Sequence, residues 1–419
     1  MGAHAMRSSE EMCVRKQLLT LILGFSVLSG CHSKPYVAPP VAPLQANTFK
    51  RQWMTPLAMQ GGEEATSLFV REKNLYIYSD RHVAYPVDKA TGVPALSMPI
   101  PERLGTMRPP VDASEKAGAR ADQTLEVVVV PTDKTLEVFN RKGGYLSSLP
   151  LSYAMGSSAV ANGSMVYSGA NFPDSGRLVA EDLNKPYGGA PRWNVRPENN
   201  VAISAAPVVQ QGIVYAAFQD GTVMAVSEER ADPIWQPLPG MVFSTAASVV
   251  ADLKADEYGI YVASTDTKLV CLDRANGKVK WQYFAGRALT DAPVATANSV
   301  FQVVRGQGIV AIDKMAGEYN RKEKWHVADA RQFLSSDDKF AYLTDKNNRI
   351  IAVDKQTGQV AFTSKRSDLR IFGTNIKDAT IYAATADGRV FAIMPVLKGG
   401  QVGELVLEKR PIDAVAVAN

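Results

Sequence analysis

Residues 259–281 read GIYVASTDTKLVCLDRANGKVKW, and this stretch decides the fold. It holds two short runs of apolar and β-branched residues separated by a polar turn, and each run has the length of a strand. The second run ends at Asp273, which is followed by Gly277 and then by Trp281. An Asp in that place can cap a tight turn, and a Gly can take the positive φ that the turn requires. The stretch predicts two antiparallel strands, a turn and an aromatic on a further strand.

The same unit recurs along the chain. Residues 340–362 read FAYLTDKNNRIIAVDKQTGQVAF, with Asp354, Gly358 and Phe362 at the spacing just described. The equivalent marker positions are Asp88, Asn140, Asp182, Ser227, Asp273, Asp313, Asp354 and Met394. Neighbouring markers lie between 40 and 52 residues apart, which is typical of a propeller whose repeats each form one four-stranded blade. We therefore predict an all-β protein, an eight-bladed β-propeller over residues 50–410.

Aromatic residues mark the outer part of the repeats. Four tryptophans follow a marker: Trp193, Trp235, Trp281 and Trp325, with Leu96 and Phe362 at that place in two other repeats. Large aromatics at a fixed position are expected to pack between neighbouring blades, because they bury much apolar area there. We expect a structural role for them rather than ligand stacking. Trp53 lies in residues 49–57, which we predict to form a lone outer strand that completes the last blade.

The N-terminal residues have the pattern of a lipoprotein signal peptide. A basic pair, Arg15-Lys16, precedes an apolar run at 18–28 that is too short to span a bilayer, and Leu-Ser-Gly-Cys at 28–31 resembles a lipobox. Cys31 is therefore predicted to carry acyl chains and to begin the mature protein, attached to a membrane through this lipid anchor. His32 follows it, which by resemblance to Gram-negative lipoproteins implies an outer-membrane location.

These patterns divide the chain into four parts. We predict a signal peptide at 1–30, a Pro-rich tether at 31–49, the propeller at 50–410 and a C-terminal tail at 411–419. Within the propeller the longest interval between markers contains residues 101–121, a polar stretch with Pro and Gly that is predicted to be an insertion between the first two blades.

Composition argues against several classes of function. The net charge is +4 and the Lys and Arg residues are dispersed, so no basic patch for nucleic acid is expected. The four histidines lie at 4, 32, 82 and 326, and no two have the spacing of metal ligands. The predicted mature chain contains two cysteines, Cys31 and Cys271. The apolar surroundings of Cys271 favour a buried, inert thiol. No catalytic residue, metal ligand or cofactor is predicted.

The repeat, with its marker Asp, Gly and Trp, resembles the PQQ-like repeat of eight-bladed propellers over roughly residues 50–410. Together with the lipobox and the Pro-rich tether, it is similar to the BamB family of outer-membrane assembly lipoproteins, most closely in residues 329–363 and 380–391. The resemblance implies a scaffold without a cofactor at the periplasmic face of the outer membrane. Its expected partner is an outer-membrane assembly barrel protein or another envelope complex, contacted through loops or a strand edge.

The resemblance does not extend to every contact residue. The Leu-x-Leu-Arg loop of the family corresponds to residues 200–207, which read NVAISAAP and lack both the leucine pair and the arginine. The loose equivalent of the family's second, acidic contact loop is residues 287–291. Arg287, Leu289 and Asp291 are therefore the predicted partner-contact residues.

Proteins of a second functional class contain the same type of repeat. Quinoprotein dehydrogenases resemble this chain in blade pattern, but they use a vicinal disulfide, a calcium site and an Asp base, and the chain has no adjacent cysteine pair. The alternative is therefore a periplasmic propeller that binds a quinone or a sugar in its central funnel, with or without oxidoreductase activity.

Overall fold

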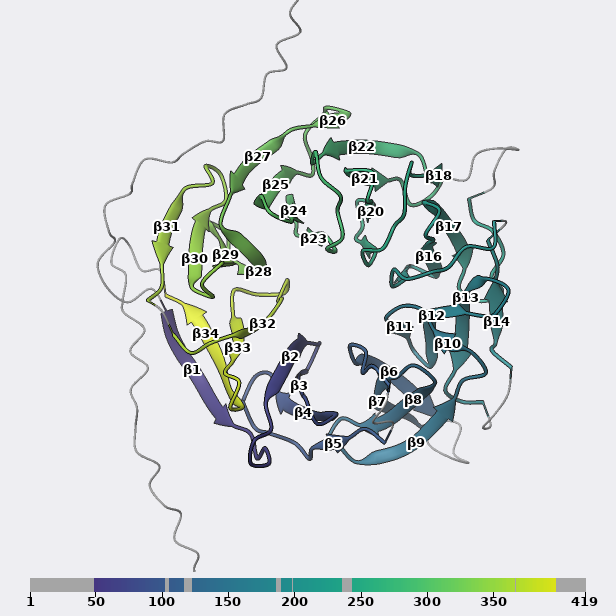
Figure 1. The fold of residues 1–419 in the computed structure, drawn as a ribbon, viewed down its shortest axis with the longest axis horizontal. Helices are drawn as coiled ribbons and strands as arrows, with labels where there is room; N and C mark the ends of the chain where they lie inside the picture. Colours follow the sequence, from purple (N-terminus) through teal and green to yellow (C-terminus); the bar gives the residue numbers. More distant parts are fainter. Residues whose placement is uncertain are drawn as a thin grey trace, which may run out of the picture. The chain divides into compact units, whose positions relative to one another are not determined.

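The computed structural model describes residues 49–101, 105–116, 123–185, 190–197, 199–235, 243–365 and 367–396. The predicted signal peptide, the predicted tether except Phe49, and the predicted tail lie outside these ranges. All the regular elements within the described ranges are β-strands, and none of the residues described there forms a helix that could cross a membrane. The strands form eight sheets arranged as the blades of one propeller (Figure 1). The predicted fold class is confirmed.

Blades 1 to 4 follow one another along the chain. Blade 1 contains β2 (Ala65–Val70), β3 (Asn74–Ser79), β4 (Val83–Asp88) and β5 (Met98–Pro99). Blade 2 contains β6 (Val111–Lys116), β7 (Thr124–Pro131), β8 (Thr135–Asn140) and β9 (Tyr145–Pro150). Blade 3 contains β10 (Ala154–Met155), β11 (Val160–Asn162), β12 (Met165–Asn171), β13 (Gly176–Asp182) and β14 (Trp193–Val195). Blade 4 contains β15 (Val208–Gln210), β16 (Ile213–Ala217), β17 (Thr222–Ser227) and β18 (Phe243–Ser244).

Blades 5 to 8 complete the ring. Blade 5 contains β19 (Lys254–Ala255), β20 (Ile260–Ala263), β21 (Lys268–Leu272), β22 (Val279–Phe284) and β26 (Asn320–Arg321). Blade 6 contains β23 (Val294–Ala295), β24 (Ser299–Val304), β25 (Gly308–Asp313) and β27 (Glu323–Val327). Blade 7 contains β28 (Ala330–Ser336), β29 (Phe340–Asp345), β30 (Ile350–Asp354) and β31 (Val360–Thr363). Blade 8 contains β32 (Ile371–Gly373), β33 (Ile381–Ala384), β34 (Arg389–Pro395) and β1 (Phe49–Pro56).

The marker positions fall at the end of the third strand of each blade, as the repeat predicts. Asp354 is the last residue of β30, and its side-chain Oδ1 accepts hydrogen bonds from the backbone N–H groups of Gln356 and Thr357 at 2.9 and 3.0 Å. The N–H of Gly358 donates to the carbonyl of Asp354 at 2.8 Å, and Gly358 has φ of 73°. A left-handed residue in this turn strongly favours glycine.

The hydrophobic core lies between the blades. Each pair of neighbouring blades shares one cluster of buried apolar side chains, and the pair formed by blades 8 and 1 has its own. Trp281, which is fully buried, belongs to the cluster between blades 5 and 6 together with Tyr261 and Cys271. The predicted packing of Trp281 between blades is confirmed. The closed ring is thus held by side chains that face neighbouring sheets.

Four tryptophans each join their blade to the turn that follows the marker of the next blade. Where that turn has a glycine, a Cβ built on the glycine would lie within 3 Å of the indole side chain, as in Trp53–Gly92, Trp235–Gly277 and Trp325–Gly358. Three indole Nε1 groups also donate to the first carbonyl after the marker: Trp193 to Glu228, Trp235 to Arg274 and Trp325 to Lys355, at 2.8 to 3.0 Å. These side chains are therefore interblade contacts, as predicted.

The ring is closed by its N-terminal strand. β1 pairs with β34 in antiparallel register from Phe49 opposite Pro395 to Pro56 opposite Arg389. Trp53 opposes Ala392 within this pairing and stacks near Tyr382. The prediction that the strand around Trp53 completes the last blade is confirmed, and Phe49 belongs to this strand rather than to the tether.

Two local features differ from the sequence expectations. Part of the 101–121 stretch is strand β6, whose apolar residues Val111 and Ala113 face a core cluster, so blade 2 begins inside the expected insertion. Leu96 does not pack between blades, because its side chain is 67% exposed while its backbone N–H donates to the carbonyl of Lys142. The polar residues that alternate with apolar ones in β6 made this short strand resemble a loop in the sequence. The distance of Leu96 from the marker could not distinguish an exposed leucine from a buried aromatic.

Candidate functional site

The predicted contact loop connects β22, the fourth strand of blade 5, to β23, the innermost strand of blade 6. Arg287 is exposed and lies beside the turn of the next blade, since a Cβ built on Gly306 would be 3.9 Å from Arg287 Nη1. Leu289 is fully buried in the cluster between blades 5 and 6, and its N–H donates to the carbonyl of Ser264 at 3.1 Å. The structure therefore assigns Leu289 to the core instead of to a contact surface, because an apolar side chain in this loop gains more by entering the interblade cluster.

Asp291 is positioned by the neighbouring turn of blade 6. Its Oδ2 accepts a hydrogen bond from Arg305 Nε at 2.7 Å, and its Oδ1 accepts one from Arg305 Nη2 at 3.2 Å. This contact with the carboxylate raises the pKa of Arg305. Arg305 is well exposed, so the pair contributes at most about 1 kcal/mol to stability. We call Arg287, Asp291 and Arg305 the Arg287 surface, a polar surface at one face of the ring.

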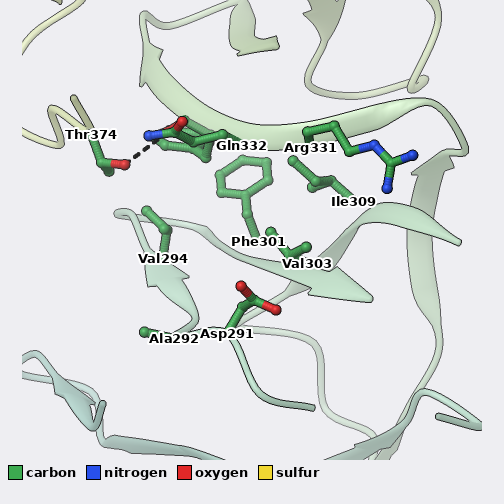
Figure 2. A pocket seen from close by; sticks show the side chains of 10 residues that line it. Asp291, Ala292, Val294, Phe301, Val303, Ile309, Arg331, Gln332 and Thr374 are labelled. Carbon is green, nitrogen blue, oxygen red and sulfur yellow. Dashed lines mark hydrogen bonds between the residues drawn. The ribbon is translucent and has the colours of Figure 1, made fainter. Parts of the chain in front are cut away.

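The backbone of Asp291 is fixed from inside the ring. Its carbonyl accepts a hydrogen bond from Gln302 Nε2 at 2.8 Å, and the Gln302 side chain is fully buried on β24. Asp291 also lines a cavity of about 300 Å³ between blade 6 and the inner strand of blade 7, which Thr374 of blade 8 borders (Figure 2). Figure 2 shows the carboxylate of Asp291 and the guanidinium of Arg331 on different walls of this cavity, with Phe301 and Val303 on its floor.

The stretch 200–207 is the connection between blades 3 and 4. It joins an outermost strand to the next innermost strand, as the 287–291 loop does, so both connections leave the same face of the ring. Ile203 is fully buried and contacts the position of Gly169, where an added Cβ would lie 2.6 Å from it. This side chain is part of the core, so the stretch offers a partner mainly its backbone and its flanking residues.

Among the residues that the structure describes, no three His, Cys, Asp or Glu side chains converge as metal ligands. Cys271 is buried, as predicted, and this burial raises the pKa of its thiol. His82 occupies a turn with φ of 57°, and His326 makes a 2.8 Å hydrogen bond between its Nε2 and the carbonyl of Gln307.

Sequence reasoning missed the polar residues that line the centre of the ring. Arg71, Arg331 and Arg370 stand on or beside inner strands, which are short and weakly patterned. The repeat had been aligned on the third strand of each blade, so it gave no register for the first. If the innermost strand of each repeat had been aligned by its distance from the third strand, these arginines would have been predicted to lie around the central axis of the ring.

Comparisons with known proteins agree with the propeller fold. Residues 132–364 match the family model described as outer membrane protein assembly factor BamB. Among solved structures, BamB from Moraxella catarrhalis is similar with a TM-score of 0.58 and 17% identity, over 83% of this chain and 99% of that one. The C-terminal WD40 domain of Sif2 is similar with a TM-score of 0.59 and 11% identity, over 85% of this chain and all of that one. At these identities the structural likeness shows the fold alone.

One curated relative comes from a different functional class. A quinohemoprotein alcohol dehydrogenase of Comamonas testosteroni is 29% identical over an alignment of 150 residues. The alignment covers 32% of this chain. The match spans 21% of that protein, so the chain corresponds to about a fifth of the length of this relative.

Proposed function

We propose that this chain, which belongs to the family of the outer membrane protein assembly factor BamB, is a non-enzymatic scaffold in outer-membrane protein assembly. The observation that carries the proposal is the match of residues 132–364, which run from blade 2 to the end of blade 7. Three marker turns of the ring are held by indole hydrogen bonds from the preceding blade, so these turns have fixed positions that suit a scaffold. The partner we propose is an outer-membrane assembly barrel protein.

The lipid anchor belongs to the same proposal. Cys31 lies in the lipobox-like stretch, and the described propeller begins with β1 at Phe49. Acyl chains on Cys31 would hold the ring at the periplasmic face of the outer membrane, because several chains together give stable anchoring. The Pro-rich residues between them would act as a semi-rigid tether.

The Arg287 surface is the proposed contact. Arg287 has an exposed guanidinium, and Asp291 and Arg305 are fixed relative to each other by two hydrogen bonds. A preformed arrangement of charges can orient a partner at little entropic cost, and such charges mainly set specificity and association rate.

The test is affinity capture of the native lipoprotein from envelopes of its own host. We expect the assembly barrel protein to be recovered with the wild type and to be lost, or strongly reduced, with Arg287→Glu. The matched control is Lys278→Glu, the same change of charge in the same blade. Lys278 lies in the marker turn, which is at the opposite face of the ring.

Two outcomes would reject the proposal at different levels. Recovery of unrelated envelope complexes without the barrel protein rejects the assembly role. Recovery of the barrel protein at equal levels with Arg287→Glu and Lys278→Glu rejects the Arg287 surface as the contact. Capture of the barrel protein by the wild type alone is the supporting result.

A second candidate function is favoured by the quinohemoprotein similarity. In that case the central funnel would bind a quinone or a sugar, with or without oxidation of a substrate. Purified protein would be mixed with pyrroloquinoline quinone, calcium and an artificial electron acceptor. Oxidation of alcohols or sugars, or a rise of several degrees in the melting temperature, would favour this candidate over the scaffold, since a ligand of the native state must stabilise it.

A further inference from the structure

A cavity of about 460 Å³ lies among the inner strands of blades 7, 8 and 1. Its size is within the range of small-molecule sites, roughly 300–1,000 Å³. It is lined by Thr66, Ser67, Leu68, Phe69, Val70, Arg71, Gln332, Arg370, Ile371, Phe372 and Thr374. The lining residues include two guanidinium groups and no carboxylate.

The two arginines stand at different levels of this cavity. Arg71 follows the last residue of β2, whereas Arg370 precedes the first residue of β32. The inner strands of all blades run in the same direction, because each blade is an antiparallel meander that the chain enters at its inner strand. Arg71 and Arg370 therefore mark opposite ends of the cavity.

Both guanidinium groups keep hydrogen-bonding capacity. Arg71 Nε donates to the carbonyl of Pro110 at 2.6 Å and Arg71 Nη1 to that of Val70 at 3.2 Å. A guanidinium has five N–H groups, so other donors of Arg71 remain. Within the described ranges the side chain of Arg370 has no hydrogen bond or ion pair in the structure.

Although burial has the larger effect on the pKa of Arg71, the carboxylate of Asp112 acts on Arg71 and raises this pKa, and Asp112 also has other partners. Asp112 Oδ2 accepts a hydrogen bond from the backbone N–H of Glu72 at 3.2 Å, and Arg141 Nη1 lies 3.8 Å from its Oδ1. Burial lowers the pKa of Arg71. Burial also lowers the pKa of Lys254 on the inner strand of blade 5, the carboxylate of Asp252 raises it, and the charge of Arg71 lowers it further. Like charges thus approach one another in the ring centre, an arrangement that an anion would relieve.

The neighbouring cavity extends the same chemistry. The 300 Å³ cavity shares Gln332 and Thr374 with the first, and it adds the guanidinium of Arg331. Asp291 is the carboxylate on its wall, and the two oxygens of Asp291 accept hydrogen bonds from Arg305. The charge of this carboxylate is therefore already compensated from outside the cavity.

We propose that the 460 Å³ cavity binds a small elongated polyanion, a molecule with carboxylate or phosphate groups at both ends, which Arg71 and Arg370 hold at opposite ends. Guanidinium groups suit both kinds of anion, because their planar N–H donors pair with two oxygens at once. The partly exposed residues Phe69 and Ile371 supply apolar walls for the middle of the molecule.

The position of the cavity predicts a structural effect of binding. The ring is closed inside blade 8, where β1 pairs with β34 without a covalent link, so that β2 lies on the N-terminal side of this seam and β32 on its C-terminal side. The inner strands approach closely there, since a Cβ built on Gly373 would lie 2.4 Å from Leu68 Cδ2 and 2.6 Å from Val70 Cγ2. A polyanion held by Arg71 of blade 1 and Arg370 of blade 8 would connect both sides of the seam. Binding should therefore raise the midpoint of unfolding.

The experiment is isothermal titration of the purified propeller with pyrophosphate in one arm and citrate in the other, at about 50 mM NaCl, where screening is moderate. Each titration is repeated with NaCl at matched ionic strength. Arg370→Gln is the main variant, because it removes no hydrogen bond of the structure. Arg71→Gln is the second, and Lys278→Gln is the control for a lost surface charge. The thermal midpoint of each protein is measured with and without ligand.

Saturable binding of either anion, weakened at least roughly tenfold by each arginine variant and unchanged by Lys278→Gln, supports the site. The arm that binds more tightly identifies the phosphate or carboxylate chemistry. No binding up to about 10 mM overturns the proposal, as does binding that only one of the two arginine variants weakens. This outcome is independent of the scaffold function, which is tested by protein capture.

Discussion

The indole Nε1 of Trp325 in blade 6 donates a hydrogen bond of 2.9 Å to the backbone carbonyl of Lys355 in blade 7. The same indole lies over Gly358, and this places the outer strand of one blade on the marker turn of the next. Trp325 has thus a polar and an apolar contact with a single turn. The Asp, Gly and Trp that recur in the sequence form one contact between two blades. The Asp and Gly come from one blade, and the Trp comes from the blade before it.

The first prediction concerns that joint. In Gly358→Ala the new Cβ would lie 2.3 Å from Trp325 Cβ, at a residue whose φ is 73°. Overpacking and the left-handed backbone both oppose the substitution, so the free energy of unfolding should fall by about 2–4 kcal/mol. Urea unfolding followed by tryptophan fluorescence measures it. Gly61→Ala is the control, because nothing lies within 4 Å of its added Cβ, and it should change stability by less than about 0.5 kcal/mol.

The second prediction concerns Trp281. Its side chain is fully buried between blades 5 and 6, and truncation of such an aromatic costs about 3–5 kcal/mol. Trp281→Ala should therefore lower the denaturant midpoint strongly, whereas Lys278→Ala on the exposed marker turn should stay within about 0.5 kcal/mol. A wild-type midpoint for Trp281→Ala would contradict the structural role.

Trp281 and Trp53 differ from the other three interblade tryptophans, because among the described residues neither indole Nε1 has a hydrogen-bond partner. At Trp281, β26 pairs in parallel with β22. The guanidinium of Arg321 on β26 lies 5.8 Å from the centre of the Trp281 ring, so this indole has a cation–π contact with its neighbour.

The third prediction is a pH dependence that arises from Glu181. Burial raises the pKa of Glu181 above the 4.5 of an exposed glutamate, although its carboxylate accepts a 2.9 Å hydrogen bond from the Tyr153 hydroxyl. The folded state then binds a proton that the unfolded state has lost, so stability decreases as pH rises from 4.5 through the raised pKa. Glu181→Gln should be more stable than the wild type by about 1 kcal/mol at neutral pH, and this gain should disappear in acid.

Asp345 provides a control of the opposite sign. Burial would raise its pKa, but hydrogen bonds from the backbone N–H groups of Arg349 and Asn347 and from the Arg349 guanidinium outweigh burial and lower it. Its contribution is present above the unfolded pKa of 3.8 and is lost as pH falls through the folded value. Asp345→Asn should therefore lose stability at neutral pH and approach the wild type in acid. Urea midpoints between about pH 3 and pH 8 compare both variants, and parallel curves would contradict the assignment.

The fourth prediction concerns the proposed lipid anchor. Cys31→Ser should move the protein from the membrane fraction to the soluble periplasmic fraction, because acylation requires the thiol. The urea midpoint of the released protein should equal that of the wild type, since the described core begins at Phe49. Cys13→Ser, within the predicted signal peptide, is the control and should leave fractionation unchanged. Membrane association that persists in Cys31→Ser would mean that the propeller or a partner holds it there.

The sequence by itself determined the architecture of this protein. The marker positions recur at nearly constant intervals, and each ends the third strand of a blade, because turn chemistry at Asp and Gly acts over a few residues and is readable locally. The strand around Trp53 was assigned to the last blade for a similar reason, since it stood alone before the first complete repeat. The burial of Trp281 and Cys271 followed from the repeat as well.

The tertiary structure alone decided which loop residues are available to partners or ligands. Leu289 and Asp291 are two residues apart in one loop, yet one is buried between blades and the other is paired with Arg305 of the next blade. Arg71 and Arg370 are about 300 residues apart and share one cavity, because ring closure brings the first inner strand beside the last. Such proximity depends on the sum of eight blade rotations, and no local pattern of residues carries that information.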